Sequence, residues 1–186
     1  LWFCDWGDKV CYMESVTGTL GSWSTKVEVE LNYRDAAWIP WHLSVFKDDG
    51  EYVMLLTTKL DAEDKRYLLA GSSINGLKFT DLHLILSPSP SGWDNQELYR
   101  SCAVRIGNIY SLYYSAMSYT GRWRIGLAEG NSLDSLGKFF FSLNFETNGG
   151  TATESQSVAD NCTGISPVSP TKPAYDFLGW YKEAEG

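Results

Sequence analysis

Residues 67–86 read YLLAGSSINGLKFTDLHLIL, two runs of strand-forming side chains on either side of the pair Asn75-Gly76. An Asn-Gly pair between apolar runs is a strong hairpin signal, because both residues accept the positive φ of a tight turn. Val, Leu, Ile, Tyr and Phe fill such runs in this chain, and Gly, Ser, Asn and Asp break them. The stretch therefore predicts antiparallel β-strands rather than a helix.

Similar stretches return along the chain at a nearly constant spacing. A weaker copy, VCYMES at residues 10–15, precedes the stretch by about 57 residues. A second anchor, WHLSVF at residues 41–46, corresponds to YRSCAV at residues 99–104, about 58 residues later, and Ala70 is followed by Ala128 at the same spacing. A period shared by separate anchors predicts that this part of the chain consists of copies of one unit.

The best-preserved copy contains four expected strands. They are residues 41–46, 52–57, 67–72 and 82–86. Four antiparallel strands in a repeat of this length are typical of a β-propeller blade. The alternative is a β-sandwich whose strands resemble one another by chance, and the shared period favours the propeller. We expect an all-β chain, with a partial propeller of about three blades of four-stranded antiparallel sheets.

Residues 1–138 hold fewer blades than a closed ring needs. They contain strands two to four of one blade, one whole blade and most of a third, whereas propellers close with about four or more. We therefore expect either further blades upstream or an open arc that depends on a partner. Residues 139–186 differ in composition and are expected to form a separate, truncated module.

The charge of the chain excludes one class of partner. The formal net charge is −8 and the pI is about 4.7, with no basic run that could neutralise phosphates, so nucleic acid is not an expected partner. No apolar stretch is long enough for a membrane span. The four Cys show no metal-ligand spacing, and no cofactor or metal is expected.

Cys4 and Cys11 flank a candidate hairpin turn at Gly7-Asp8. Pairing outward from a two-residue turn places the two cysteines opposite each other. A disulfide would form there in an oxidising compartment. Two buried free thiols are the alternative.

The C-terminal segment contains a specific motif. FETNGG at residues 145–150, PTKP at residues 170–173 and the aromatic run ending in Gly179-Trp180-Tyr181 resemble the Listeria-Bacteroides repeat, of internalin B type. This resemblance implies a small β-rich module found on bacterial surface and secreted proteins. It implies an extracellular or cell-surface location, with a cell-wall or surface partner for the repeat.

The repeated units resemble a second family. Residues 67–79 and 105–116 look like blade motifs of the five-bladed propeller in arabinanase and β-xylosidase-type glycoside hydrolases. The resemblance spans roughly residues 1–138 and implies polysaccharide or oligosaccharide as the partner. Its motifs belong to the blades and not to a catalytic site.

Candidate site residues follow from the repeat. The innermost strand of each blade lines the channel of a propeller, and the two inner strands align Trp41 with Tyr99 and His42 with Arg100. Aromatic rings stack on sugars, while His and Arg bond hydroxyl or carboxylate groups. The alternative is that both aromatic rings belong to the core and that His42 and Arg100 bond nearby backbone.

Glycoside hydrolysis usually needs two carboxylates. Glu97 is the best catalytic candidate, because it lies two residues before Tyr99 at the entrance of an inner strand, but the chain does not supply a complete set. Two functions remain open. One is a fragment of a secreted or cell-surface glycoside hydrolase whose missing blades supply the other carboxylates, and the other is a non-catalytic carbohydrate-binding or adhesive surface protein.

Overall fold

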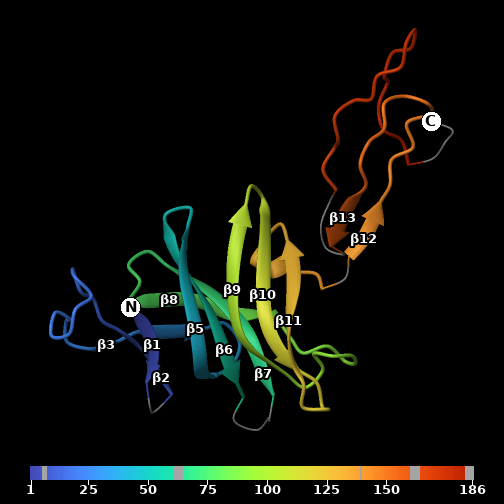
Figure 1. Ribbon diagram of the computed structural model, residues 1–186. Helices are drawn as coiled ribbons and strands as arrows, with labels where there is room; N and C mark the ends of the chain where they lie inside the picture. Colours follow the sequence, from blue (N-terminus) through green and yellow to red (C-terminus); the bar gives the residue numbers. More distant parts are fainter. Residues whose placement is uncertain (6–7, 61–64, 139, 160–163, 183–186) are drawn as a thin grey trace.

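The computed structural model describes residues 1–5, 8–60, 65–138, 140–159 and 164–182, and its regular secondary structure is almost entirely β-strand (Figure 1). Within those residues the one helical element is the 3-10 turn η1, Leu133–Ser135. The strands of the described residues form four sheets, three of them before residue 139. The expected all-β class is confirmed. No helix in the described residues has the length and apolar character needed to cross a membrane.

The second sheet contains the complete repeat unit. Its antiparallel strands are β5 (Ile39–Asp48), β6 (Glu51–Lys59), β7 (Arg66–Ser73) and β8 (Lys78–Leu86). Asp49 and Gly50 have φ values of 45° and 90° between β5 and β6, which is the left-handed backbone that a tight hairpin requires. All four strands predicted from the sequence are present.

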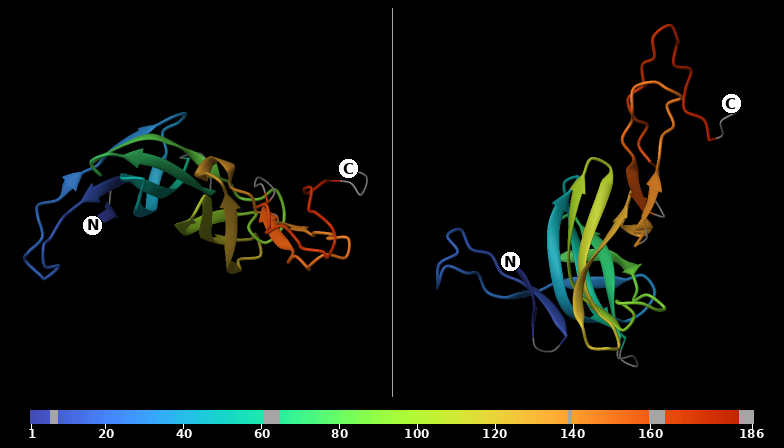
Figure 2. Two further views of the ribbon diagram at one scale, coloured as in Figure 1. Left: turned by 90° about the horizontal axis from the view of Figure 1, so that it is seen from above. Right: turned by 45° about the vertical axis from the view of Figure 1, so that its right-hand side comes forward.

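Two further sheets flank this unit. The first comprises β1 (Trp2–Asp5), β2 (Lys9–Tyr12) and β3 (Val27–Glu28). The third comprises β9 (Glu97–Ile106), β10 (Ile109–Met117) and β11 (Trp123–Gly130). Seen from above, the sheets follow one another along an arc (Figure 2). Three successive sheets of this kind form a partial β-propeller, as the repeat predicts.

The alternating residues 26–31 are divided between two sheets at Val29. The backbone N–H of Val29 donates to Val10 in the first sheet, whereas that of Glu30 donates to Leu77 beside β8, each at 2.9 Å. The strand β4 (Glu30–Tyr33) then runs parallel to β8. It covers an edge of the second sheet that would otherwise present unpaired backbone groups.

The register of the first hairpin also differs from the prediction. Cys4 lies opposite Val10, and Cys11 lies opposite Phe3. The expected pairing of Cys4 with Cys11 is therefore wrong by one residue. The last pair of the hairpin is Asp5 with Lys9, and three residues rather than two lie between them. Two of these, residues 6–7, lie outside the described residues. Both thiols are free, and burial raises the pKa of Cys4 to about 11.

The sheets pack face to face through two apolar clusters. One cluster joins the first and second sheets around Val10, Met54 and Phe79. The other joins the second and third sheets around Leu68 and Leu112. Each of the strands β5 to β8 contributes apolar side chains to both clusters, because the sheet lies between two neighbours.

Charged groups join the second and third sheets at the β5–β6 turn. The Arg105 guanidinium donates to Asp48 at 2.8 Å and to Asp49 at 2.6 Å, and the Tyr110 hydroxyl also donates to Asp48. The hydrogen bond from Tyr110, together with those from Arg105, holds the pKa of Asp48 below its usual value. This network holds the second and third sheets together at the end of their interface where the β5–β6 turn lies.

The C-terminal segment projects away from the three sheets (Figure 1). It contains the antiparallel pair β12 (Phe140–Leu143) and β13 (Gln156–Ala159). Beyond this pair, the Trp180 ring lies 5.0 Å from the ring of Phe145 and 5.2 Å from that of Phe177. Asn148 and Gly149 have positive φ values, as the NGG turn predicts. The β-rich repeat module expected here is confirmed.

Candidate functional site

Trp41 lies on a β-bulge near the start of β5. Pro40 pairs with Thr58 and His42 with Thr57, so Trp41 has no residue of its own opposite it on β6. Proline is tolerated at such irregular positions because it lacks a backbone N–H. A bulge turns a side chain away from the regular direction of its strand. Trp41 is 38% exposed, a large fraction for a tryptophan inside a strand.

The strand β9 carries a bulge at the matching place. Its pairing with β10 shifts between Tyr114 and Ala116, so Tyr99 and Arg100 both lie opposite Ser115. The Ser115 hydroxyl accepts a hydrogen bond from the backbone N–H of Arg100 at 3.1 Å and donates to its carbonyl at 3.3 Å. The same irregularity therefore occurs in both inner strands at the position given by the repeat.

These bulges bring aromatic rings from different strands together. The Trp41 Nε1 donates to the Tyr99 hydroxyl at 3.4 Å. The His42 ring meets the Tyr99 ring edge-on, with 4.6 Å between centroids. Trp123, at the start of β11, lies 5.2 Å from Tyr99 and is 48% exposed. Trp41, His42, Tyr99 and Trp123 are called the aromatic cluster below.

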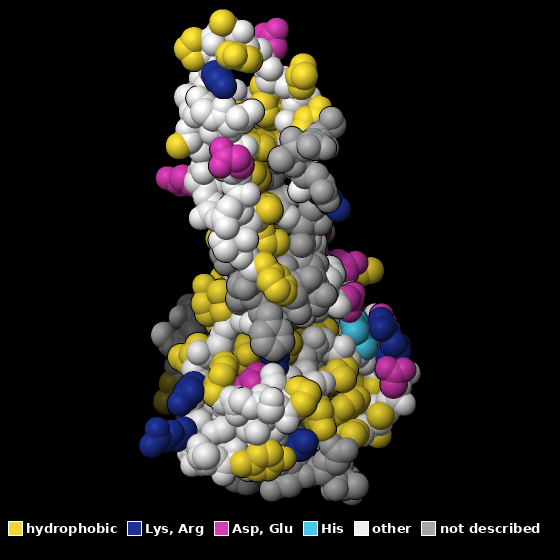
Figure 3. Space-filling model, turned by 90° about the vertical axis from the view of Figure 1, so that its right-hand side faces the viewer, with side chains coloured by type: hydrophobic (Ala, Val, Ile, Leu, Met, Phe, Trp, Pro, Cys, Tyr) yellow, Lys and Arg dark blue, Asp and Glu magenta, His cyan; other side chains and the backbone are white. Residues whose placement is uncertain are grey.

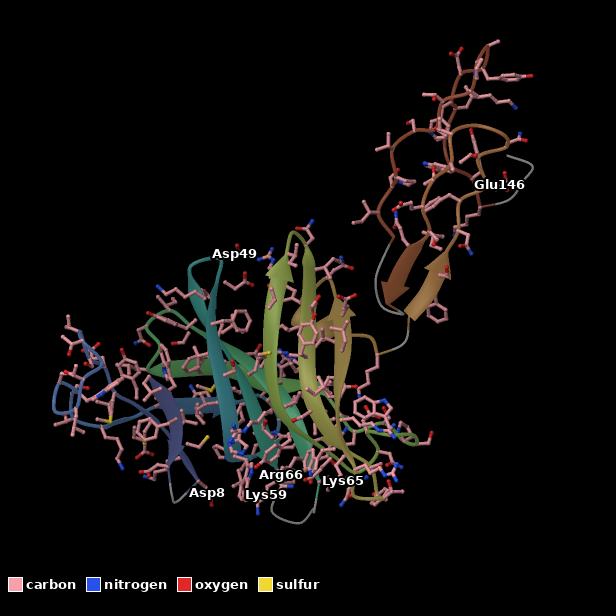
Figure 4. The ribbon with its side chains drawn as sticks, in the orientation of Figure 1. Asp8, Asp49, Lys59, Lys65, Arg66 and Glu146 are labelled. Atoms are coloured by element: carbon pink, nitrogen blue, oxygen red, sulfur yellow. The ribbon has the colours of Figure 1, made fainter. Side chains whose placement is uncertain are left out.

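Arg66 and Glu97 form an ion pair beneath this cluster. Arg66 begins β7 and lies at the end of the sheets where Lys59 and Lys65 are found (Figure 4). Its guanidinium carbon lies 4.9 Å from the Trp41 ring centroid and 5.8 Å from that of Tyr99. Its Nη1 pairs with the carboxylate of Glu97, which is 5% exposed. The ion pair compensates a carboxylate that would be costly to bury alone.

His42 is held as a neutral imidazole. Burial lowers the pKa of His42, and the positive charges of Arg100 and Arg66 lower it further. Its Nε2 is buried and has no hydrogen-bond partner among the described residues. At neutral pH the ring is therefore uncharged.

The structure brings the five predicted site residues to one end of the second and third sheets. Trp41, His42 and Tyr99 are in contact, and Glu97 lies beside them through Arg66. Arg100 is exposed, and none of the described residues forms an ion pair with it.

Sequence reasoning missed Arg66 and Trp123. Both residues open the third strand of a sheet, β7 and β11 respectively. The spacing of about 58 residues between Ala70 and Ala128 also relates these two strand starts. Counting back from Ala70 and Ala128 to the first residues of the two strands would have identified Arg66 and Trp123 as site residues.

The arrangement suits binding, and Glu97 is the carboxylate that the described residues bring to it. The acidic residue nearest to Glu97 in the sequence is Asp94, and its carboxylate has other partners. It accepts hydrogen bonds from Lys138 at 2.7 Å and from the Tyr114 hydroxyl at 3.1 Å. The described residues contain no group of three His, Cys, Asp or Glu side chains that could hold a metal ion. The site thus offers aromatic faces, two arginines, a neutral imidazole and Glu97.

Residues 141–186 match the family model of the Listeria-Bacteroides repeat domain. The resemblance of the C-terminal segment to this repeat is thereby confirmed, for about a quarter of the chain. No curated protein matches the sequence. The boundary at residues 138 and 139 stays a prediction, two residues before the matched segment.

Solved structures match part of the chain. An N-acetylgalactosamine deacetylase from F. plautii, in complex with blood group B trisaccharide, is 22% identical with a TM-score of 0.52. The match covers 65% of this chain and 40% of that one. A GH43 beta-xylosidase/alpha-arabinofuranosidase from a compost microbial metagenome, in complex with xylotriose, is 22% identical with a TM-score of 0.40 and coverages of 55% and 36%.

The chain thus spans 40% or less of the length of either enzyme. The likeness to the deacetylase shows a shared fold. The predicted resemblance to propeller enzymes is confirmed at the level of the fold, over 65% of this chain.

Proposed function

We propose that this chain is part of a carbohydrate-active protein and that the aromatic cluster binds an oligosaccharide or polysaccharide. The pair of matching bulges carries the proposal, because they expose Trp41 and bring it to Tyr99 from two separate sheets. Exposed aromatic faces stack on sugar rings. Arg100 supplies hydrogen-bond donors for hydroxyl or carboxylate groups beside them.

Substitution of Trp41 tests this proposal. Trp41→Ala should weaken binding of xylotriose, arabinotriose or blood group B trisaccharide about tenfold in calorimetric titration, because a stacking surface is lost. His42→Ala and Arg100→Ala should also weaken it. The matched control is Trp23→Ala, since Trp23 is 37% exposed in the loop before β3. Equal affinity of the two tryptophan variants would contradict the proposal.

Glycoside hydrolysis is the specific form of this function that Glu97 favours. Its carboxylate is buried at the strand entrance that also holds Tyr99, and Arg66 contacts both residues. Hydrolysis needs a second carboxylate about 5 to 10 Å away, which other parts of a longer polypeptide would supply. A non-catalytic carbohydrate-binding or adhesive protein is the alternative, supported by the ion pair that occupies Glu97.

A Glu97→Gln variant of the longest available reading frame separates these two forms. For the hydrolase, release of reducing ends from arabinan or xylan should fall at least about a hundredfold, with sugar affinity retained. The double variant Arg66→Met/Glu97→Gln controls for the unpaired buried arginine that the single change leaves. Hydrolysis at the original rate by a folded Glu97→Gln protein would exclude a catalytic role for this residue.

The C-terminal repeat suggests a location outside the bacterial cell. We propose that the protein is secreted or attached to the cell surface, with residues 139–186 acting as a spacer or as contact with a wall or surface partner. The match to the Listeria-Bacteroides repeat supports this proposal. Fractionation of expressing cells tests it: recovery of the full-length protein only from the cytoplasm would contradict it.

A further inference from the structure

A groove of about 610 Å³ lies beside β11. Its lining includes Trp93 from the segment before β9, Tyr114 from β10, and Arg124 and Gly126 from β11. None of the residues of the aromatic cluster lines it. Small-ligand sites have volumes of roughly 300 to 1,000 Å³, so the groove has room for a ligand. Figure 3 views the side of the sheets on which β11 lies, where hydrophobic side chains are found among Lys and Arg side chains.

Two stacked aromatic rings form one wall of this groove. Trp93 stacks on Tyr114, with 5.8 Å between the ring centroids and 18° between the ring planes. Both rings lie against Gly126, because a Cβ added there would come within 2.6 Å of Tyr114 and 2.7 Å of Trp93. A glycine inside a strand often marks a place where another group approaches the backbone closely. The arrangement of the two rings therefore requires glycine at this position.

A buried ion pair holds the tyrosine of this wall. Asp94 is 3% exposed, and its carboxylate accepts hydrogen bonds from the Tyr114 hydroxyl at 3.1 Å and from the Lys138 ammonium group at 2.7 Å. Lys138 also donates to the Ser87 carbonyl at 2.7 Å and to the Ser89 hydroxyl at 3.3 Å. These three contacts use all the donors of the ammonium group. Because their charges are opposite, Asp94 and Lys138 together add no net charge to the groove.

Arg124 brings a positive charge to the same wall. Residues i and i+2 of a strand share a face, so Arg124 lies on the face of β11 that holds Gly126 and the two rings. Arg124 is exposed, and it forms no ion pair with a residue that the structure describes. A guanidinium group binds a carboxylate through two parallel hydrogen bonds. Because aromatic rings stack on sugars, this wall suits a sugar ring that carries a carboxylate.

We propose that the groove binds a uronate unit of an acidic oligosaccharide or polysaccharide. The sugar ring packs against Trp93, and its carboxylate pairs with the guanidinium group of Arg124. The inference rests on the proposed function for the class of ligand, but it assigns a second site. The two sites lie on either side of β11, because Trp123 of the aromatic cluster and Arg124 are adjacent residues that face opposite sides of the strand.

Calorimetric titration of the full chain with trigalacturonate tests the charge of this site. Trigalacturonate should bind more tightly than neutral galactotriose, and Arg124→Gln should weaken its binding about tenfold and remove the preference. Arg122→Gln is the matched control, since Arg122 is also exposed but does not line the groove. No preference for the acidic sugar, or equal affinities of the two arginine variants, would overturn the proposal.

Two further measurements test the location. Trigalacturonate should shift the backbone amide signals of Arg124 and Gly126 in NMR spectra, and unshifted signals would overturn the proposal. The Trp41→Ala variant should keep its affinity for trigalacturonate, because Trp41 does not line the groove. Loss of that affinity would place the acidic sugar at the aromatic cluster and would overturn the second site. Undiminished xylotriose binding by the same variant would contradict the proposed function alone.

Discussion

His42 shows how much one residue depends on its surroundings. It lies against Tyr99, near Arg66 and Arg100, and its Nε2 has no described partner. An ordinary imidazole would titrate near pH 6.5. Here both burial and the two guanidinium charges oppose the protonated form, so the pKa of His42 is lowered in the folded state only.

This difference makes stability depend on pH. Because the pKa of His42 is lower in the folded chain, the unfolded chain binds more protons just below pH 6.5, and the free energy of unfolding falls as the pH falls. We expect urea unfolding to show a decline between about pH 7 and about pH 5.5 that His42→Gln reduces. An identical slope in the variant would show that His42 does not contribute to it.

At the scale of the element, the bulges decide which side chains reach the site. A regular β9 would alternate its side chains strictly between the two faces. The extra residue opposite Ser115 breaks this alternation at Tyr99 and Arg100. The Ser115 hydroxyl satisfies the backbone N–H and carbonyl of Arg100 that the bulge leaves without a regular ladder partner.

Ser115→Ala should therefore act on the site through the bulge. The loss of two hydrogen bonds should reduce the free energy of unfolding by about 1 kcal/mol, measured in urea. If the bulge positions Tyr99, sugar affinity should fall as well, while Ser111→Ala, on the same strand, should leave affinity unchanged. Loss of stability with full sugar affinity in Ser115→Ala would show that the serine has no positioning role.

At the scale of the molecule, the sheets depend on one another. Leu112 of β10 is fully buried and lies in the apolar cluster that joins the second and third sheets. The buried face of each sheet is covered by the neighbouring sheet. Few side chains within one sheet could therefore take over the contacts that Leu112 makes across the interface. The aromatic cluster also depends on the packing of the two sheets, since Trp41 and Tyr99 come from different sheets.

Leu112→Ala should destabilise both sheets together. The cavity should cost about 3 kcal/mol in the free energy of unfolding, and a single transition should still be seen by tryptophan fluorescence and by circular dichroism. Ile106→Ala, at a position that is 74% exposed, is the matched control and should cost little. Separate transitions for the two probes would show that the sheets unfold independently.

The sequence alone determined the strand positions, the period of the repeat and the C-terminal motif. These depend on local signals, namely alternating apolar runs and the turns at Asp48-Asp49-Gly50 and Asn75-Gly76. The period also identified Trp41 and Tyr99 as equivalent, and the two bulges occur at this spacing. Patterns within a few residues, and their recurrence, are visible without coordinates.

Only the tertiary structure decided which strands and side chains meet. The transfer of β4 to the edge of β8, the offset of Cys4 from Cys11 and the ion pair of Arg66 with Glu97 were not in the pattern. Each is a choice between partners far apart in the chain that have similar local propensity. Burial and the pairing of backbone groups across whole sheets select among them, and no single stretch of sequence carries that information.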